Sequence, residues 1–378
     1  MSQHDVTAVE REFVGLPSPV VGRAGAGGHP CQGLYHRPAG RRPTTAFIAT
    51  HYNVDFSEHY LADYMAARGF GFLGWNTRFR GAEAYFLLDH ALAEIGVGVR
   101  WLRDQAGVER IVLLGNSGGG SLMAGYQSQA VEPNIRPAPG LRLVDAALDL
   151  VPGDLYVSLA AHRGRPDVLT EWMDPSVVTE GDPVATDPGL DMYDAAHGPP
   201  YSAEFLARYR AAQEARNRRI SDWARSELER ADAEAAGVRD QLFTLIRTWA
   251  DPRFVDPTID PSERPTPACY LGDPAAANRG VFGIGVLNTL RTWLSMWSLD
   301  DSQCRAEPHL ARVTLPALVV EASADSGVFP SDTAAMYDAL ASADKEVATV
   351  TGDHYFRQPD GARDEVADLL AGWLEDRS

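Results

Sequence analysis

The sequence predicts an α/β protein: a mostly parallel, doubly wound sheet with helices on both faces and a large helical insertion. Three observations lead to this prediction. Short apolar runs alternate with amphipathic stretches up to residue 162, the alternation stops over 163–310, and it returns over 311–378. Such alternation is typical of a parallel sheet covered on both faces. We therefore expect one core in two parts, 1–162 and 311–378, with 163–310 inserted as a helical lid.

The elements follow in chain order. Residues 8–40 contain short apolar runs broken by glycine and proline, which favours an antiparallel lead-in. The runs expected as buried strands, each short and rich in Ala, Val, Ile, Leu or Phe, are 46–50, 70–75, 110–114, 155–159, 316–320 and 346–350. The stretches expected as helices, with apolar residues at three- and four-residue spacing, are 58–68, 84–102, 332–340 and 363–374.

The insertion differs from the core in its composition and in its pattern of apolar residues. Its prolines gather at 182–200 and 252–267, and between them 203–249 is rich in Ala, Arg and Glu. Apolar residues recur there at helical spacing, with an interruption near Gly237. We expect 203–249 to be helical, with its interspersed acids and arginines forming a solvated face.

Composition narrows the class of function. Of the 378 residues, 45% are hydrophobic and 23% charged, which is ordinary for a globular protein, and the formal net charge is −18. A chain this acidic repels phosphate backbones and anionic membrane surfaces, so we expect no nucleic-acid or membrane partner. A small-molecule substrate is the expected partner, and a homodimer stays open.

The expected location is cytoplasmic. The three cysteines, Cys31, Cys269 and Cys304, show neither a disulfide framework nor zinc-ligand spacing, which suits a reducing compartment. The N-terminal residues lack the basic flank and apolar run of a signal peptide, and no window has the length of a membrane span.

The strongest chemical signal is a candidate nucleophile at Ser117. Gly115-Asn116-Ser117-Gly118-Gly119 fits G-x-S-x-G, with an apolar strand before it and a helix-forming run after it. This context is that of a nucleophile elbow, where a sharp turn exposes the serine hydroxyl. Gly115 and Gly119 suit a close approach of strand and helix, and the N–H of Gly118 is placed to bind an oxyanion. A phosphate-binding loop is the competing interpretation, but its lysine is missing.

A serine hydroxyl needs a base to take its proton. Of the ten histidines, His354 follows the last expected strand and precedes the final helix. Loops after parallel strands gather at one edge of the sheet, which is the edge that presents Ser117. His354 is therefore the expected base.

The histidine in turn needs a carboxylate to fix its tautomer. Asp325 lies in the loop after the penultimate strand and is the expected acid. Glu321, at the strand end, and Asp353, adjacent to the histidine, are its rivals.

These residues together resemble the α/β-hydrolase superfamily. The order Ser117, Asp325, His354 and the Gly-Asp-His triplet before the last helix are similar to it, over about 40–160 and 312–378. The resemblance implies that the N–H of Tyr52 or Asn53 is a second oxyanion donor. Many relatives carry His-Gly at this place, and here Tyr52 takes the position of that glycine. It also implies that the segment 76–81 braces the site.

The sequence offers further site candidates. His51 is expected to brace its loop, and His51, Asp55 and His59 fit no standard metal-ligand spacing, so neither a metal nor another cofactor is expected. His162 follows a strand and borders the expected pocket. Tryptophans of the insertion are candidate pocket-lining residues: Trp172, Trp223, Trp293 and Trp297.

The predicted function is cleavage of a carboxylic ester or lactone with a bulky apolar or aromatic portion, through an acyl-enzyme on Ser117. The same triad serves a carbon–carbon bond hydrolase or an acyltransferase, so both stay open. A non-catalytic binding protein on this scaffold is the alternative of another class.

Overall fold

The computed structural model describes residues 8–20, 31–233 and 239–377. Within these ranges eight strands form one sheet in the order β1-β2-β4-β3-β5-β6-β9-β10. The strands are β1 (Val9–Leu16), β2 (Cys31–Pro38), β3 (Thr45–Ala49), β4 (Gly71–Asn76), β5 (Arg110–Asn116), β6 (Leu155–Leu159), β9 (Ala317–Ala322) and β10 (Lys345–Val350). β1 and β4 pair antiparallel with β2, and the remaining pairs are parallel. The predicted antiparallel lead-in and parallel core are both present.

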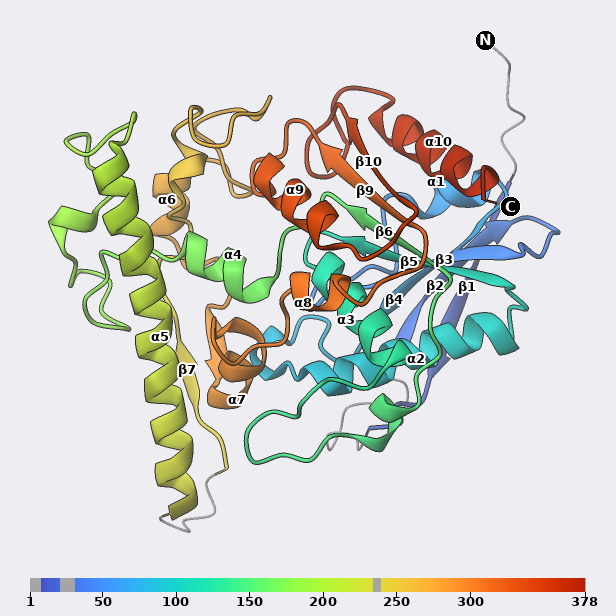
Figure 1. Cartoon of the computed structure of the whole chain (residues 1–378), viewed down its shortest axis with the longest axis horizontal. Coiled ribbons are helices and arrows are strands. Elements are labelled where there is room, and N and C mark those ends of the chain that lie inside the picture. Colours follow the sequence, from blue (N-terminus) through green and yellow to red (C-terminus); the bar gives the residue numbers. More distant parts are fainter. Residues whose placement is uncertain (1–7, 21–30, 234–238, 378) are drawn as a thin grey trace.

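Helices cover both faces of the sheet (Figure 1). Alternate side chains of β5 point to opposite faces, so Ile111 and Leu113 belong to one buried cluster and Val112 and Leu114 to another. The first cluster is covered by α2 (Leu88–Asp104), α3 (Gly119–Val131), α8 (Glu307–Leu310) and α9 (Pro330–Ala339), and the second by α1 (Ala62–Ala67) and α10 (Ala362–Glu375). The doubly wound architecture predicted from the sequence is confirmed.

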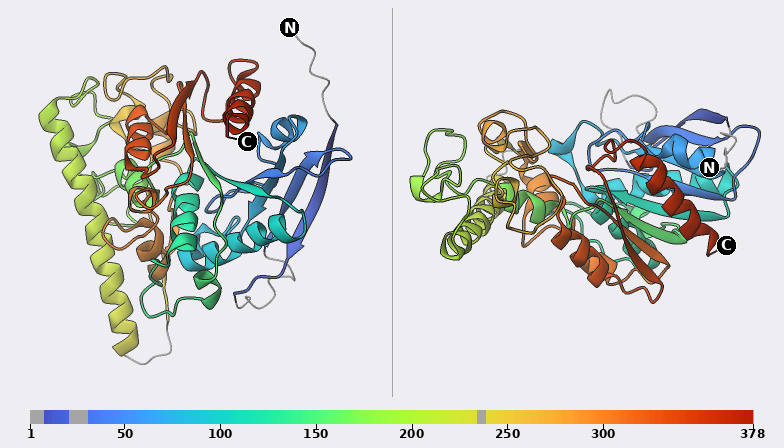
Figure 2. Two further views of the ribbon diagram at one scale, coloured as in Figure 1. Left: turned by 45° about the vertical axis from the view of Figure 1, so that its right-hand side comes forward. Right: turned by 90° about the horizontal axis from the view of Figure 1, so that it is seen from above.

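The segment between β6 and β9 contains no strand of the large sheet in its described residues. Its α-helices are α4 (Arg165–Trp172), α5 (Ala203–Ala233), α6 (Pro274–Asn278), α7 (Leu290–Thr292) and α8 (Glu307–Leu310), and a π-helical turn at Trp293–Trp297 directly follows α7. In Figures 1 and 2, α5 is the outermost helix, with α4 and α7 between it and the sheet. None of the helices in the described ranges combines the length and apolar character needed to cross a bilayer.

The prediction of helix throughout 203–249 was wrong in its last part. Helix α5 ends at Ala233, and β7 (Leu242–Thr244) pairs antiparallel with β8 (Leu287–Thr289). The reason is tertiary: the Phe243 ring packs between those of Trp223 and Trp293, with centroids 5.1 and 5.8 Å away. The chain therefore returns along α5 as a strand. Gly237, the expected interruption, lies outside the described residues.

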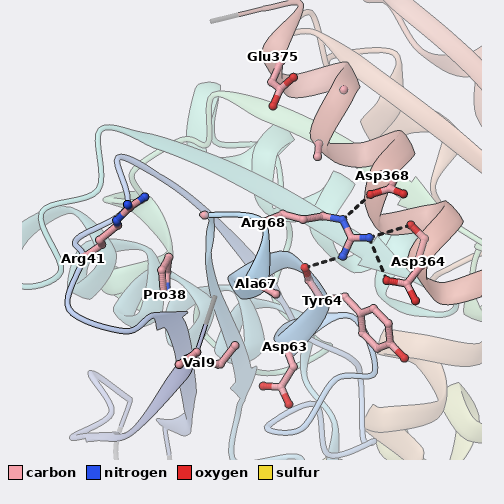
Figure 3. A pocket seen from close by; sticks show the side chains of 14 residues that line it. Val9, Pro38, Arg41, Asp63, Tyr64, Ala67, Arg68, Asp364, Asp368 and Glu375 are labelled. Atoms are coloured by element: carbon pink, nitrogen blue, oxygen red, sulfur yellow. Dashed lines mark hydrogen bonds and ion pairs between the residues drawn. The ribbon is translucent and has the colours of Figure 1, made fainter. Parts of the chain in front are cut away.

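One pocket, of about 1030 Å³, is lined by β1, β2, α1 and α10 (Figure 3). Arg68 is tied there to Asp364 (3.0 Å) and Asp368 (2.7 Å). None of the predicted site residues lines it.

Two glycines allow β5 and α3 to meet at a sharp turn. A Cβ atom on Gly115 would lie 2.5 Å from the Cα of Gly120, and one on Gly119 would lie 2.5 Å from the carbonyl oxygen of Thr50. Both neighbours are backbone atoms, which cannot rotate away as a side chain can. Glycine is required here for close approach.

We predict that Gly115→Ala lowers the free energy of unfolding by about 1–3 kcal/mol, because the added methyl overpacks the turn. Thermal unfolding measures this. Gly372→Ala is the matched control, since a Cβ there meets nothing within 4 Å inside α10. That variant should be about 0.5–1 kcal/mol more stable than wild type. Equal stability of the two variants would contradict the close approach.

Candidate active site

Ser117 stands at the turn between β5 and α3. Its φ angle is 55°, in the left-handed region that costs a non-glycine residue about 1–2 kcal/mol. Two backbone hydrogen bonds hold it there: its N–H donates to the Leu159 carbonyl (3.1 Å), and its carbonyl accepts from the Gly120 N–H (3.1 Å). This strained conformation at a strand–helix turn is the backbone signature of a nucleophile elbow.

Asp325 and His354 form a buried pair. Asp325 lies in the loop after β9 and His354 in the loop after β10, and their side chains meet with His354 Nδ1 2.5 Å from Asp325 Oδ2. Asp325 Oδ1 accepts from the N–H groups of Gly327 (2.9 Å) and Val328 (3.0 Å). The loop of Asp325 therefore holds its carboxylate in place. The pair uses Nδ1 of the imidazole and leaves Nε2 out of this contact.

The two rival acids have other surroundings. Asp353 accepts from the N–H groups of Tyr355 (3.1 Å) and Arg357 (2.8 Å), so its carboxylate closes its own loop. Glu321 lies within β9, where burial, and then the charge of Asp260, raise the pKa of its carboxyl group. Of the three candidate acids, Asp325 is the one that contacts His354.

Ser117 and His354 share no hydrogen bond among the described residues, and such bonds often tighten only with substrate in place. The surroundings of His51 show that the loop carrying Ser117 and the loop carrying His354 are neighbours. Its Nε2 lies 2.8 Å from the position that a Cβ on Gly118 would occupy, and the charge of His354 contributes to lowering its pKa. The loops carrying Ser117 and His354 therefore converge on His51.

Backbone donors for an oxyanion are present beside Ser117. Among the described residues, the N–H groups of Gly118 and Tyr52 donate to no protein acceptor. The N–H of Asn53 is directed to His51 Nδ1 at 3.4 Å. The side chain of Tyr52 is held by α3, because its hydroxyl oxygen lies 3.0 Å from Ser121 Oγ. Of the two expected donors, Tyr52 is the one whose N–H is available.

His51 braces this loop, as expected for it. Burial, then the charges of Arg165 and His162, lower its pKa well below 6.5, so the ring is neutral at pH 7. Its Nδ1 accepts from the N–H groups of Asn53 (3.4 Å) and Val54 (3.3 Å), which places its single proton on Nε2.

The neighbouring polar residues support the same loop. Asn76 accepts from the Phe56 N–H (2.9 Å) and donates to Asp55 (2.8 Å), so the segment after β4 braces the loop after β3. His59 Nε2 lies 3.1 Å from Asn116 Oδ1. Asp55 and His59 are thus engaged in hydrogen bonds within the fold.

The residues expected to line the pocket divide into two groups. His162 is buried, its Nδ1 has no partner in the described part of the chain, and burial lowers its pKa to about 3. Trp172 packs edge-on against Tyr270 with ring centroids 5.9 Å apart, and the Arg165 guanidinium lies 4.4 Å over Trp297. These side chains lie around the candidate site.

Trp223 and Trp293 have a different place. The Trp293 indole donates to Ser221 Oγ (2.9 Å), and both rings pack on Phe243. Trp223 also lines a separate pocket of about 510 Å³ between α5 and β7. The structure gives these two residues a packing role between α5 and the two-stranded sheet of β7 and β8.

Sequence reasoning missed two residues of this region. Arg165 is 3% exposed, pairs with Glu83, and its charge acts on both His51 and His162. It follows β6 closely, so the rule that selected His162 also selects Arg165. Tyr270, whose hydroxyl lies 2.9 Å from Asp325 Oδ1, comes from a loop of the insertion with no local pattern to mark it.

No family model and no curated protein match this sequence. Solved structures do resemble it. The α/β hydrolase GrgF from Penicillium sp. sh18 has a TM-score of 0.50 at 12% identity, over 97% of each chain. The structure of DcsB with its substrate analogue has a TM-score of 0.51 at 15% identity, over 97% of this chain and 99% of that one.

This chain has the α/β-hydrolase fold. The resemblance predicted from the sequence is therefore confirmed at the level of the fold. In the α/β-hydrolase fold of this chain, the turns after β3, β5, β6, β9 and β10 all open at one edge of the sheet. Tyr52, Ser117, His162, Asp325 and His354 stand in those five turns.

We predict that Asp325→Asn lowers kcat by on the order of 10⁴-fold, because the amide stabilises the wrong imidazole tautomer. Steady-state kinetics with a p-nitrophenyl ester measures this. Glu321→Gln is the matched control and should retain activity within about twofold. An active Asp325→Asn beside an inactive Glu321→Gln would move the acid to Glu321.

Proposed function

We propose that the protein is a serine hydrolase that cleaves a carboxylic ester or a lactone. The observation that carries this proposal is the buried Asp325–His354 pair, which lies at the sheet edge where the strained Ser117 turn also ends. A carboxylate, an imidazole and a serine on an elbow form the set that acyl transfer requires.

In the proposed mechanism Ser117 Oγ attacks the substrate carbonyl carbon while His354 Nε2 takes the hydroxyl proton. Asp325 accepts the Nδ1–H bond and stabilises the imidazolium. The N–H groups of Gly118 and Tyr52 bind the oxyanion, since both lack other acceptors in the described ranges.

His354 then returns its proton to the leaving alcohol oxygen, which departs and leaves an ester on Ser117. Water, deprotonated by the same imidazole, attacks that ester. Collapse of the second oxyanion releases the acid and restores the serine hydroxyl. A carbon leaving group or an alcohol acceptor would use the same residues, so substrate panels must separate those reactions.

The substrate's apolar portion is proposed to lie against the insertion. Trp172 is 3% exposed and Trp297 is fully buried, and each contacts a residue that lies by the catalytic edge. The two indole rings pack behind Tyr270 and Arg165 and so shape an apolar space that would suit an aryl or bulky alkyl group. We propose that the segment 163–310 acts as a lid controlling which substrates enter.

We predict that Ser117→Ala abolishes labelling by a fluorophosphonate probe and lowers kcat by on the order of 10⁶-fold with the fold intact. Gel-based labelling, ester hydrolysis and thermal unfolding measure the three quantities. Ser331→Ala, in the first turn of α9, is the control and should label normally. Wild-type protein that takes no label at Ser117 would favour a non-catalytic binding protein.

We also predict a difference among the lid tryptophans. Trp172→Phe and Trp297→Phe should change kcat/KM for a bulky aryl ester by about tenfold, and for p-nitrophenyl acetate by less than about twofold. Trp223→Phe is the control and should change neither, because its ring packs on Phe243 of β7 rather than on a residue of the catalytic edge. Equal effects on large and small esters would contradict a lid that selects by size.

A further inference from the structure

A tyrosine of the insertion reaches the acid–base pair of the core. Tyr270 lies between the 3₁₀ turn Pro252–Phe254 and α6. Its hydroxyl oxygen is 2.9 Å from Asp325 Oδ1 and 3.0 Å from His354 Nδ1. Its ring centroid is 4.6 Å from that of the imidazole. One side chain from the insertion thus contacts both members of the pair.

The position of the imidazole proton decides whether the Tyr270 hydroxyl donates or accepts. His354 Nδ1 lies 2.5 Å from the carboxylate, so its proton is committed to Asp325 Oδ2. The Tyr270 hydroxyl therefore donates to Asp325 Oδ1. Burial, then the charge of Asp325, raise the pKa of Tyr270 well above 10, which keeps it a donor throughout the working pH range.

Three donors then converge on one carboxylate oxygen. The N–H groups of Gly327 and Val328 come from the loop of Asp325 itself, and the third donor is the Tyr270 hydroxyl. Hydrogen bonds to a charged acceptor are the strong ones, and together they fix the plane of the carboxylate. With Oδ1 fixed, Oδ2 stays directed at the imidazole.

The position of Tyr270 is set by both parts of the protein. A Cβ on Gly327 of the core would lie 2.4 Å from the tyrosine ring, so the ring rests directly on that glycine. On its other side lie Trp172 and Trp249 of the insertion, with ring centroids 5.9 and 6.4 Å away. Tyr270 is therefore placed correctly only when the aromatic cluster of the insertion is docked on the core.

We propose that Tyr270 is a positioning residue that orients Asp325, and through it His354, so that the acid–base pair is complete only with the insertion docked. This inference rests on the proposed hydrolase function. Tyr270 does not touch the reacting atoms. It acts through the carboxylate, and it makes the insertion part of the catalytic unit as well as a cover over it.

Tyr270→Phe keeps the ring and removes the hydroxyl, so it isolates the hydrogen bond. The expected result is a fall of about tenfold in kcat for p-nitrophenyl acetate and in the rate of fluorophosphonate labelling, with KM little changed. The acid limb of both pH profiles should move to higher pH. The reason is that a carboxylate relieved of one donor attracts the imidazolium more strongly.

Tyr193→Phe is the matched control. Tyr193 is also a tyrosine of the insertion, and its hydroxyl donates to the Trp249 carbonyl rather than to the pair. It should keep the wild-type kcat and pH profile. A merely structural role for Tyr270 would lower the melting temperature and leave the pH profile in place.

A readout independent of turnover separates this inference from the proposed function. The His354 Nδ1 proton should give a far-downfield NMR signal in the Ser117→Ala protein, assigned by its loss in Ser117→Ala/Asp325→Asn. Adding Tyr270→Phe should shift that signal, and adding Tyr193→Phe should not. A shifted signal in a protein whose wild type takes no probe supports the positioning role and overturns only the hydrolase assignment. An unshifted signal with unchanged kinetics overturns the positioning role.

Discussion

The left-handed backbone of Ser117 is the constraint on which the rest of the candidate site depends. With φ at 55°, the chain turns from β5 into α3 over the two residues Ser117 and Gly118, and the close contact of Gly115 with Gly120 leaves no room for a wider turn. The hydrogen bond from Ser117 to Leu159 ties that turn to the neighbouring strand β6. Two buried strands, β5 and β6, therefore hold the strained turn in place.

The same sheet places the other groups relative to that turn. Because β3, β5, β6, β9 and β10 are parallel, residues distant in sequence leave the sheet at one edge. What happens beyond that edge is decided by hydrogen bonds within the loops. Asp325 is held by its own loop and aimed at His354, whereas Asp353 is turned into its own loop and Asn53 is turned to His51.

Docking of the insertion on the core is also electrostatic. Arg165 at the start of α4 pairs with Glu83 of the core and lies 5.1 Å over the Tyr52 ring. Arg253, paired with Asp251 within the insertion (2.6 Å), lies 4.0 Å over the ring of Phe329, which precedes α9 of the core. Buried charges are costly when left without partners, so the Arg165–Glu83 pair and the Arg253–Phe329 contact favour one docked arrangement over a loose one. The same arrangement brings Tyr270 to the acid–base pair.

The sequence by itself determined the parallel core and the glycine-flanked turn at Ser117, and it placed His354 in the loop after the last strand. Apolar runs and the glycine spacing are local patterns, and local sterics enforce them. The tertiary structure alone decided that Tyr270 reaches Asp325, that Tyr52 rather than Asn53 has an unused N–H, and that 242–244 is a strand. The first and the last depend on contacts between residues tens of positions apart, which no periodicity records because the packing of the insertion sets them. The second depends on the orientation of the His51 ring, whose Nδ1 faces the N–H of Asn53.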